Sequence, residues 1–355
     1  MAANGMLEFQ TPGMNGYAVK YSPFFDDRIA VATSQNFGLV GNGRLYICKM
    51  GMNGIEAEKW FDTQDALYDV AWSEIHENQA VVASGDGSVK LFDINLNEFP
   101  IQAWQEHRRE VYSVAWNLVA KDTFASSSWD GTIKIWNPHR PASVLTLPTH
   151  SCTYSTAWSP HSPSVISSVT SDSHLRVFDL RTPASSSNHL VHLVPVHGVA
   201  PRTNGVPGAE MYSSQPSECL SHDWNKYRPE TIATAGVDTI IRTFDLRNAM
   251  GGPLAQLAGH DYAVRKVAWS PHLSDILLSA SYDMTCRVWS DGSKTQPVGQ
   301  PNAMVAQGRE IGRMSRHTEF CTGIDWCLFG SEGWCASVSW DKKLLVWDVR
   351  AIMRQ

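Results

Sequence analysis

One phrase recurs along the chain and constrains its fold more than any other feature. It consists of an apolar run ending in an aromatic residue, a polar turn, a run of small residues, a turn containing Asp, and a last run ending in Trp or Phe. It reads VYSVAW and then FASSSWDGTIKIWN within 111–137, and VRKVAW and then ILLSASYDMTCRVWS within 264–290. Apolar and polar residues that alternate between turn formers predict short antiparallel strands.

Seven copies of the phrase can be aligned. Further copies begin near residues 67, 154, 219 and 322, and a degenerate first copy occupies 16–47. The last runs end at Asp93, Asn137, Asp179, Asp245, Ser290 and Asp348. Three of the five intervals between these positions match the roughly 40–45 residues of a WD repeat. Since one four-stranded unit cannot bury both faces but a closed ring can, we predict an all-β, seven-bladed β-propeller as a single domain over 1–355.

The other two intervals are longer. They contain segments rich in Pro, Gly and Ser at about 181–217 and 291–312. Such composition is typical of loops, so we predict two insertions that lie between blades.

The tryptophans follow the repeat. Six of them end the same strand in successive copies, and Tyr21 takes that place in the first copy; the six are Trp72, Trp116, Trp158, Trp224, Trp269 and Trp326. Three others end a second strand. Side chains that recur at one position of every repeat are predicted to form the core between blades rather than a ligand cage.

A polar signature also recurs with constant spacing. It comprises His, Ser, Asp and Trp, and we predict that each set forms one hydrogen-bonded tetrad, since buried Asp and His are costly unless they are paired. The sets are His107, Ser126, Asp130 and Trp136; His260, Ser279, Asp283 and Trp289; and His317, Ser337, Asp341 and Trp347. Catalysis requires one Ser-His-Asp triad and not several in register, so the prediction is structural.

Composition excludes several classes of protein. A formal net charge of −6 with a pI near 6.1 argues against nucleic-acid binding, which usually rests on a basic surface. No run approaches the roughly 18 apolar residues of a membrane span, and the first residues lack the pattern of a signal peptide, so we expect no membrane insertion. The seven cysteines lie in strand-like segments without a CxxC pair, which indicates reduced thiols in a cytosolic protein.

The chain lacks the motifs of the common enzyme classes. The glycine-rich GLVGNG at 38–43 lies between strand-like runs and no helix follows it, so we interpret it as a loop rather than a phosphate site. No Cys and His have the spacing of zinc ligands. We therefore expect no catalytic residue, no metal and no cofactor.

Aligning the repeats predicts the side chains at the mouth of the central channel, where the loops enter the innermost strands. Aromatic and charged residues gather there. Two interpretations remain open: partly buried rim packing, or a docking surface on which aromatics anchor and acids orient a basic amphipathic peptide. The candidate binding residues are Asp65, Tyr68, Glu110, Tyr112, Trp129, Tyr154, Glu218, Arg265, Tyr282 and Trp340.

Several phrases are more specific than a repeat consensus. They include GYAVKYSPFFDDRIAVATSQNFGLVGNG (16–43), TQDALYDVAWSEIHENQ (63–79), EHRREVYSVAWN (106–117) and WNKYRPETIATAGVD (224–238). They resemble the peroxin 7 family, the receptors for the type 2 peroxisomal targeting signal, in its fungal form. The resemblance covers nearly the whole chain, including the degenerate first repeat.

The resemblance implies a soluble receptor in the cytosol that cycles to the peroxisome, its docking membrane and matrix. Its cargo would carry an N-terminal signal of the type Arg/Lys-Leu-x5-His/Gln-Leu, as thiolase-like proteins do. Its partners would be a co-receptor of the peroxin 20, 18/21 or long peroxin 5 type and the peroxisomal docking complex. Acids at the positions of Asp65 and Glu110 would face the basic residues of the signal, while aromatic and apolar neighbours would hold its leucines and the co-receptor.

An alternative function is a WD-repeat adaptor in a chromatin or ubiquitin-ligase complex. Histone-binding members of that class resemble chains with a long helix before the propeller. Here the first repeat begins within about fifteen residues, and we expect no preceding helix.

Overall fold

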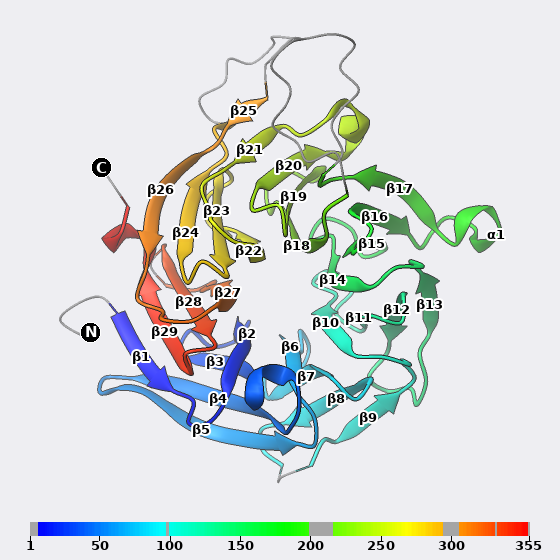
Figure 1. Cartoon of the computed structure of the whole chain (residues 1–355). Coiled ribbons are helices and arrows are strands. Elements are labelled where there is room, and N and C mark those ends of the chain that lie inside the picture. The colour runs from blue at the N-terminus through cyan, green and yellow to red at the C-terminus, as the bar shows by residue number, and fades with distance from the viewer. Residues whose placement is uncertain (1–5, 97–98, 199–215, 294–304, 331, 354–355) are drawn as a thin grey trace.

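The fold is a ring of seven sheets around a central axis (Figure 1). The computed structural model describes residues 6–96, 99–198, 216–293, 305–330 and 332–353. In each sheet the first strand of the repeat lies next to the axis and later strands lie further out. The predicted all-β, seven-bladed propeller is therefore confirmed.

The first three blades have four strands each, paired antiparallel in sequence order. Blade 1 consists of β2 (Asn15–Tyr21), β3 (Arg28–Ser34), β4 (Gly43–Gly51) and β5 (Gly54–Thr63). Blade 2 consists of β6 (Leu67–Trp72), β7 (Gln79–Ser84), β8 (Ser88–Asp93) and β9 (Gln102–Gln105). Blade 3 consists of β10 (Val111–Trp116), β11 (Phe124–Ser128), β12 (Thr132–Trp136) and β13 (Leu145–Pro148).

Blades 4 to 6 repeat this plan. Blade 4 consists of β14 (Thr153–Trp158), β15 (Val165–Thr170), β16 (His174–Asp179) and β17 (Leu190–Pro195). Blade 5 consists of β18 (Cys219–Trp224), β19 (Thr231–Gly236), β20 (Ile241–Asp245), β21 (Ala255–Leu257) and a fifth strand, β25 (Ala306–Gln307). Blade 6 consists of β22 (Val264–Trp269), β23 (Ile276–Ser281), β24 (Cys286–Ser290) and β26 (Arg309–Met314).

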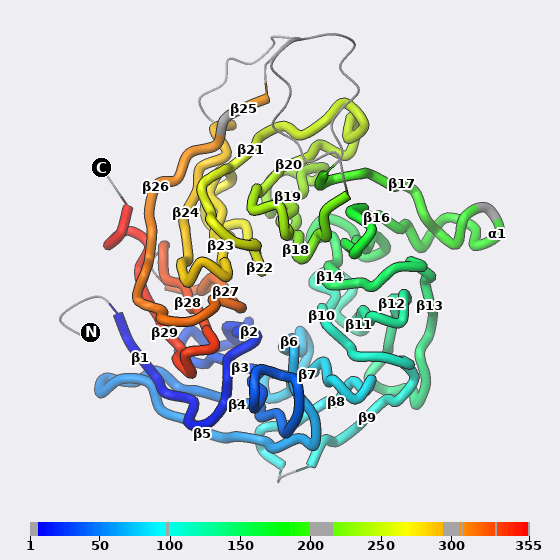
Figure 2. Tube along the Cα trace, in the orientation of Figure 1, coloured from blue at the N-terminus to red at the C-terminus, as the bar shows by residue number. Residues whose placement is uncertain are grey.

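Blade 7 joins the two ends of the chain. Its inner strands are β27 (Cys321–Trp326), β28 (Trp334–Ser339) and β29 (Lys343–Asp348), and its outer strand is β1 (Met6–Gln10). Met6 pairs with Trp347 and Gln10 with Lys343, so blue and red segments lie side by side in Figure 2. The repeats predicted from the sequence begin at residue 16 and do not include β1. Its five residues have no turn signal beside them that would assign them to the last blade.

The two predicted insertions are shorter than their proposed bounds. The segment 181–217 contains the short helix α1 (Ala184–Ser187) and then β17, while 291–312 contains β25 and the first part of β26. The density of Pro and Ser hid the apolar run Leu190–Pro195, which makes the outer strand of blade 4. The remainder, 199–215 and 294–304, lies outside the described residues.

The six repeated tryptophans lie between blades. All are buried, and each packs against the preceding blade: Trp72 lies in one core cluster with Ala30 and Leu45 of blade 1. The indole N–H groups of Trp72 and Trp326 donate to carbonyl groups of the neighbouring blade, those of Lys20 (2.9 Å) and Ala268 (3.1 Å). The repeated aromatic residue therefore supplies both the apolar core and part of the polar bonding between blades.

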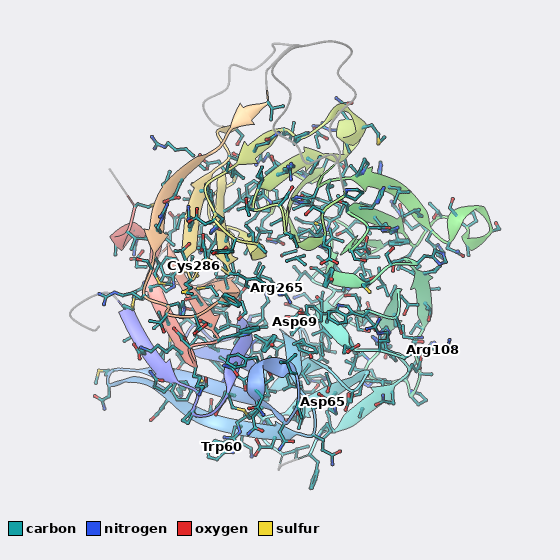
Figure 3. The ribbon with its side chains drawn as sticks, viewed as in Figure 1. Trp60, Asp65, Asp69, Arg108, Arg265 and Cys286 are labelled. Carbon is teal, nitrogen blue, oxygen red and sulfur yellow. The ribbon has the colours of Figure 1, made fainter. Side chains whose placement is uncertain are left out.

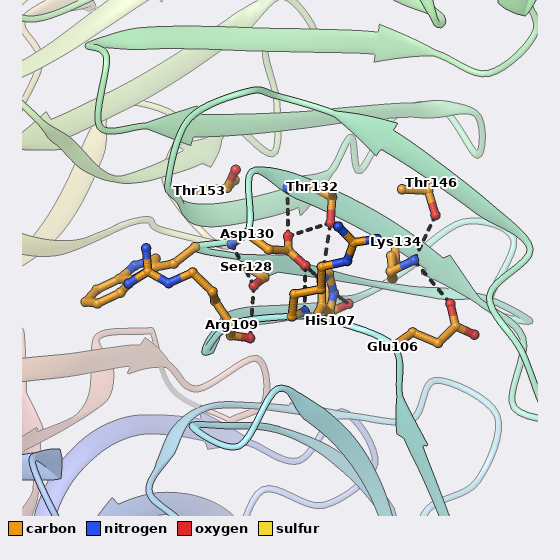
Figure 4. Close-up of polar contacts among 12 residues, drawn as sticks. Glu106, His107, Arg109, Ser128, Asp130, Thr132, Lys134, Thr146 and Thr153 are labelled. Atoms are coloured by element: carbon orange, nitrogen blue, oxygen red, sulfur yellow. Dashed lines mark hydrogen bonds and ion pairs between the residues drawn. The ribbon is translucent and has the colours of Figure 1, made fainter.

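The three tetrads form closed hydrogen-bond networks. In blade 3, His107 contacts Asp130 at 2.9 Å (Figure 4). His107 also contacts Ser126 (2.8 Å), and the Trp136 indole donates to Ser126 (2.8 Å). The sets around His260 and His317 have the same pattern. The tetrad Asp also accepts a backbone N–H of the loop that enters the innermost strand, from Arg108 in blade 3.

A fourth network was missed by the sequence analysis. His197 contacts Asp238 (2.8 Å) and Thr234 (3.0 Å) in blade 5. Thr replaces Ser, Phe244 stands where the other sets have Trp, and a long insertion separates the His from its Asp. The insertion removes the constant spacing of the His, and the other two departures change the residue types by which the other tetrads were recognised.

Two further predictions concerned the cysteines, which were expected to be reduced thiols, and membrane-spanning segments, of which none was expected. The seven cysteines form no disulfide bond, and six of them are buried. Burial raises the pKa of the Cys48 thiol to about 12, which keeps it protonated. Within the described ranges, no helix has the length and apolar character needed to cross a membrane.

Removing residues 1–10 should destabilise the ring more than removing residues 1–5 does. The larger deletion takes away β1 and leaves the edge of β29 unpaired. Several lost backbone hydrogen bonds at about 1 kcal/mol each should lower the thermal midpoint by several degrees. Differential scanning fluorimetry of the two deletions checks this, and equal midpoints would contradict closure by β1.

Asp283→Ala should cost about 3 kcal/mol or more, because it leaves the buried Arg287 and His260 without their shared partner. Asp261→Ala is the matched control, since the Asp261 side chain is 80% exposed and lies 3.9 Å from Arg287. That change should cost less than about 1 kcal/mol. Urea unfolding measures both.

The stability difference between wild type and Asp283→Ala should depend on pH. Burial alone would raise the pKa of Asp283, but hydrogen bonds from His260 and Thr285 and the charge of Arg287 hold it below its usual value. The stabilisation that the Asp283 carboxylate gives the folded state is therefore complete above the pKa of Asp in the unfolded chain, which is about 4. It is lost as the pH falls from there toward the lower pKa of the folded state. The difference between wild type and Asp283→Ala should shrink from pH 7 to pH 3, and a constant difference would argue against the charged pair.

Candidate functional site

Every innermost strand contains a bulge at the same place. In β2, Gly16 pairs with Thr33 and Ala18 with Ala32, so the residue between them has no partner. A bulge of this kind re-aims the side chain of its extra residue. The same shift recurs in the first strand of all seven blades. The extra residues are Tyr17, Tyr68, Tyr112, Tyr154, Leu220, Arg265 and Thr322.

Aromatic rings from several blades meet at one end of the channel. Tyr68 lies 5.3 Å from Tyr17 and 4.9 Å from Tyr112, measured between ring centroids. Tyr112 stacks on Trp129 at 5.1 Å and meets Tyr154 at 5.6 Å. Adjacent blades thus contribute one continuous arc of rings.

A second group of rings extends this arc through blades 6 and 7. Tyr282 stacks on Phe320 at 4.8 Å, Phe320 lies 5.2 Å from Trp340, and Trp340 lies 5.9 Å from Tyr17. Phe37 also contacts Trp340, at 5.2 Å. We call the whole set the aromatic mouth: Tyr17, Phe37, Tyr68, Tyr112, Trp129, Tyr154, Tyr282, Phe320 and Trp340.

The loop between β3 and β4 belongs to this mouth, which the sequence analysis did not predict. The Tyr17 hydroxyl donates to the Phe37 carbonyl (2.6 Å), and the Tyr68 hydroxyl donates to the Gly38 carbonyl (3.0 Å). Leu39 and Val40 follow and are 83% and 75% exposed. The glycines of GLVGNG predicted a loop. Its apolar residues, which are unusual in an exposed loop, were the sequence signal that could have assigned it to the mouth.

Two of the predicted acids lie at the edge of the arc. Asp65 and Tyr68 both lie against Gly85, and the Glu110 carbonyl accepts the backbone N–H of Trp129 at 3.1 Å. Burial, Tyr112 and the charges of the two carboxylates raise the pKa of Tyr68 to about 12. Within the described part of the chain no Lys or Arg pairs with Asp65, while Glu110 has the exposed Arg109 at 3.5 Å. Asp65 is therefore available to a basic group of a partner.

A glycine makes room for Asp65. Blades 3, 6 and 7 have Trp129, Tyr282 and Trp340 before the turn Asp, but blade 2 has Gly85 there. A Cβ atom on Gly85 would lie 2.8 Å from the Asp65 carboxylate. The missing side chain in this blade leaves the acid at the mouth.

The third predicted acid has a partner. The Tyr154 hydroxyl donates to Glu218 at 3.1 Å, and burial followed by the Glu218 charge raises the pKa of Tyr154. Glu218 is consequently less available for a ligand than Asp65. The ten predicted residues thus lie around one mouth, but they differ in whether they already have polar partners.

Arg265 is the cation of the mouth. Its side chain reaches from blade 6 across the channel, and its guanidinium lies 4.8 Å from the centre of the Tyr112 ring in blade 3. Figure 3 shows Arg265 near the middle of the ring of blades, close to Asp69. A cavity of about 250 Å³ lies at the other end of the channel, lined by residues at the ends of the innermost strands such as Trp72, Trp116 and Trp158.

Salt bridges line that cavity. Lys20 pairs with Asp325 at 2.8 Å, Lys266 lies 3.9 Å from Asp69, and Lys226 pairs with Asp223 at 2.7 Å. In the described ranges, no group of three or more His, Cys, Asp and Glu side chains has the arrangement of a metal site.

Two family models match the chain. The WD domain, G-beta repeat model matches residues 251–290, which include β22 to β24. The model described as eukaryotic translation initiation factor eIF2A matches residues 29–180, from β3 to β16, which is less than half of the chain.

Curated relatives match over nearly full length. The peroxisomal targeting signal 2 receptor of Saccharomyces cerevisiae is 40% identical over 97% of this chain and 99% of its own length. Its counterpart from Komagataella phaffii is 40% identical over 98% and 100%, and the human protein is 35% identical over 89% and 87%. These names describe receptors, a non-enzymatic kind of protein, as the sequence analysis expected.

Long alignments at this identity establish common descent and a shared fold, and they confirm the resemblance found in the sequence. The chain belongs to the family of peroxisomal targeting signal 2 receptors, which are WD-repeat β-propeller proteins.

Proposed function

We propose that this protein binds the N-terminal type 2 signal of peroxisomal matrix proteins and delivers them to the peroxisome together with a co-receptor. The full-length similarity to proteins named as receptors for this signal supports the proposal. On this proposal the protein cycles between the cytosol and the peroxisomal docking complex, and its cargo is thiolase-like. The family assignment favours this function over an adaptor in chromatin or ubiquitin-ligase complexes.

The signal has the chemistry that the mouth would recognise. In Arg/Lys-Leu-x5-His/Gln-Leu the two leucines are seven residues apart, as are the two polar positions. In a helix, the two residues of each pair lie on the same side, about 10 Å apart along the axis. The leucines then form an apolar stripe, and the polar and basic residues lie along one edge of that stripe. The aromatic mouth would hold the leucines, and Asp65 and Glu110 would pair with the basic edge.

One observation carries this assignment: Asp65 is a carboxylate without a cationic partner in the described chain, next to a continuous arc of aromatic rings. A basic residue of a ligand that packs on the aromatic rings would come within pairing distance of the Asp65 carboxylate. Since a charge-assisted hydrogen bond contributes about 1.5–3 kcal/mol when partly desolvated, each acid can account for at least a ten-fold change in affinity.

We propose that the co-receptor covers the exposed end of the β3–β4 loop. Leu39 and Val40 are exposed beside the mouth, and the loop that carries them is held by the hydroxyl groups of Tyr17 and Tyr68. A second protein that packs on both the loop and the bound signal would bury these side chains. This arrangement would make binding of signal and co-receptor cooperative.

Asp65→Lys with Glu110→Lys should weaken signal binding at least 100-fold and leave the circular dichroism spectrum unchanged, since neither residue belongs to a tetrad. Fluorescence anisotropy of a labelled Arg-Leu-x5-His-Leu peptide, with and without a co-receptor fragment, measures this. Exchanging the basic residues of the peptide for Glu should restore part of the affinity. In cells, cargo with a fluorescent type 2 signal should move from peroxisomes to the cytosol.

The matched control is Glu56→Lys with Glu77→Lys, which changes the net charge equally at exposed positions of β5 and the β6–β7 loop. If both double variants bind the peptide like wild type, the signal site lies elsewhere on the ring.

Leu39→Asp with Val40→Asp should weaken binding of the co-receptor fragment about ten-fold or more, because each buried apolar side chain contributes about 1.5–3 kcal/mol. Leu96→Asp, an exposed leucine between β8 and β9, is the control. Pull-down titrations with the fragment compare the two variants. Equal affinities would exclude the β3–β4 loop from the co-receptor contact.

A further inference from the structure

Three arginines of the described chain are buried: Arg242, Arg265 and Arg287. Arg242 pairs with Asp238, and Arg287 pairs with both Asp283 and Glu310 at 2.9 Å. Arg265 is 5% exposed, and among the described residues no carboxylate lies within ion-pair distance of its guanidinium. A buried charge without a counter-ion is costly, so this exception requires an explanation.

The surroundings of Arg265 do not neutralise it. Its nearest partners are aromatic: the Tyr112 ring at 4.8 Å and the phenol of Tyr282. Burial raises the pKa of Tyr17 and of Tyr282, so both remain neutral phenols at physiological pH. The contact with Tyr112 is a cation–π interaction, which stabilises a guanidinium but does not cancel its charge.

The channel below Arg265 does not supply its counter-ion. Its cavity is lined by three lysines and four carboxylates, Lys20, Lys226 and Lys266 against Asp69, Glu74, Asp223 and Asp325. Asp325 pairs with Lys20, Asp223 with Lys226 and Glu74 with Lys121. Asp69 accepts hydrogen bonds from Ser113 (2.9 Å) and Val114 (3.2 Å) and has Lys266 at 3.9 Å. Each of these carboxylates already has a cation nearby, and none lies within ion-pair distance of Arg265.

Beyond the recognition of a basic signal, and resting on the proposed function, we infer that Arg265 is a binding site for a carboxylate carried by the protein segment that occupies the aromatic mouth. An Asp or Glu side chain of that segment inserts between the rings and forms a bidentate pair with the guanidinium. The mouth then binds groups of both charges. Asp65 and Glu110 at its edge pair with the basic group, and Arg265 in the channel pairs with an acid.

The low exposure of Arg265 favours a single carboxylate over a polyanion. Its side chain is 5% exposed and its guanidinium lies against the Tyr112 ring, so a partner can reach it only with one small group. A planar fork of N–H donors matches a carboxylate better than a lysine ammonium would. Within a desolvated mouth the pair is stronger than on the protein surface.

The first experiment uses the full chain and acetate as the probe. The Arg265 Nε–H resonance, assigned by its loss in Arg265→Lys, should move saturably as sodium acetate replaces sodium chloride at constant ionic strength. No movement up to the highest acetate concentration would overturn the inference. Because no peptide is involved, this result is independent of whether the signal binds.

The second experiment separates a binding role from a structural one. Arg265→Gln should weaken the complex with the signal peptide and co-receptor fragment about ten-fold, which corresponds to about 1.4 kcal/mol, and Arg265→Lys should weaken it less. The thermal midpoint of the free Arg265→Gln protein should be unchanged or higher, since the variant removes an unpaired buried charge. A lower midpoint with unchanged affinity would assign Arg265 to the fold alone.

Binding of Arg265→Gln to the signal peptide alone, compared with binding in the presence of the co-receptor fragment, shows which partner carries the carboxylate. A loss of affinity with the peptide alone assigns the acid to the cargo, and a loss that requires the fragment assigns it to the co-receptor. If wild type binds neither peptide nor fragment but the acetate experiment succeeds, the proposed function fails and the carboxylate site stands.

Discussion

Pairing of β1 with β29 is the constraint on which the rest of the molecule depends. The strand that begins the described chain completes the blade that ends it, so the ring closes with hydrogen bonds rather than by contact of side chains alone. Closure fixes the angle between neighbouring blades and lets each repeated Trp pack against the blade before it. With the blades fixed, the seven innermost strands converge on one axis, and the bulge in each strand delivers one side chain to the same mouth.

The tetrads connect this scaffold to the mouth. His107, His260 and His317 lie in the loops that lead to Glu110, Arg265 and Phe320, respectively. Each tetrad Asp also binds a backbone N–H of its loop. The loops that carry the mouth residues are therefore held by buried hydrogen bonds, and the site is prepared before a partner arrives.

Charge in the mouth is arranged in two levels. Carboxylates without buried partners lie near Tyr68, and the guanidinium of Arg265 lies against the Tyr112 ring without a carboxylate partner among the described residues. On the proposed function, this arrangement would select a ligand with both signs of charge in a fixed order, which gives more discrimination than an acidic surface would. The propeller fold alone carries no such information, because the same fold supports many functions.

The repeat by itself determined the seven blades, the place of the six tryptophans between blades, the three tetrads and the ten candidate side chains around the mouth. A two-residue strand period and a recurring turn fix which residues share a face. Only the tertiary structure decided what has no local period. It showed β1 in the last blade, β17 and the first part of β26 inside the predicted insertions, the His197 network, and Phe37 beside Trp340. It also decided which charges are paired: Glu218 bonds Tyr154, whereas Arg265 reaches Tyr112 three blades away and finds no carboxylate there, since ion pairing depends on distances between residues that lie far apart in sequence.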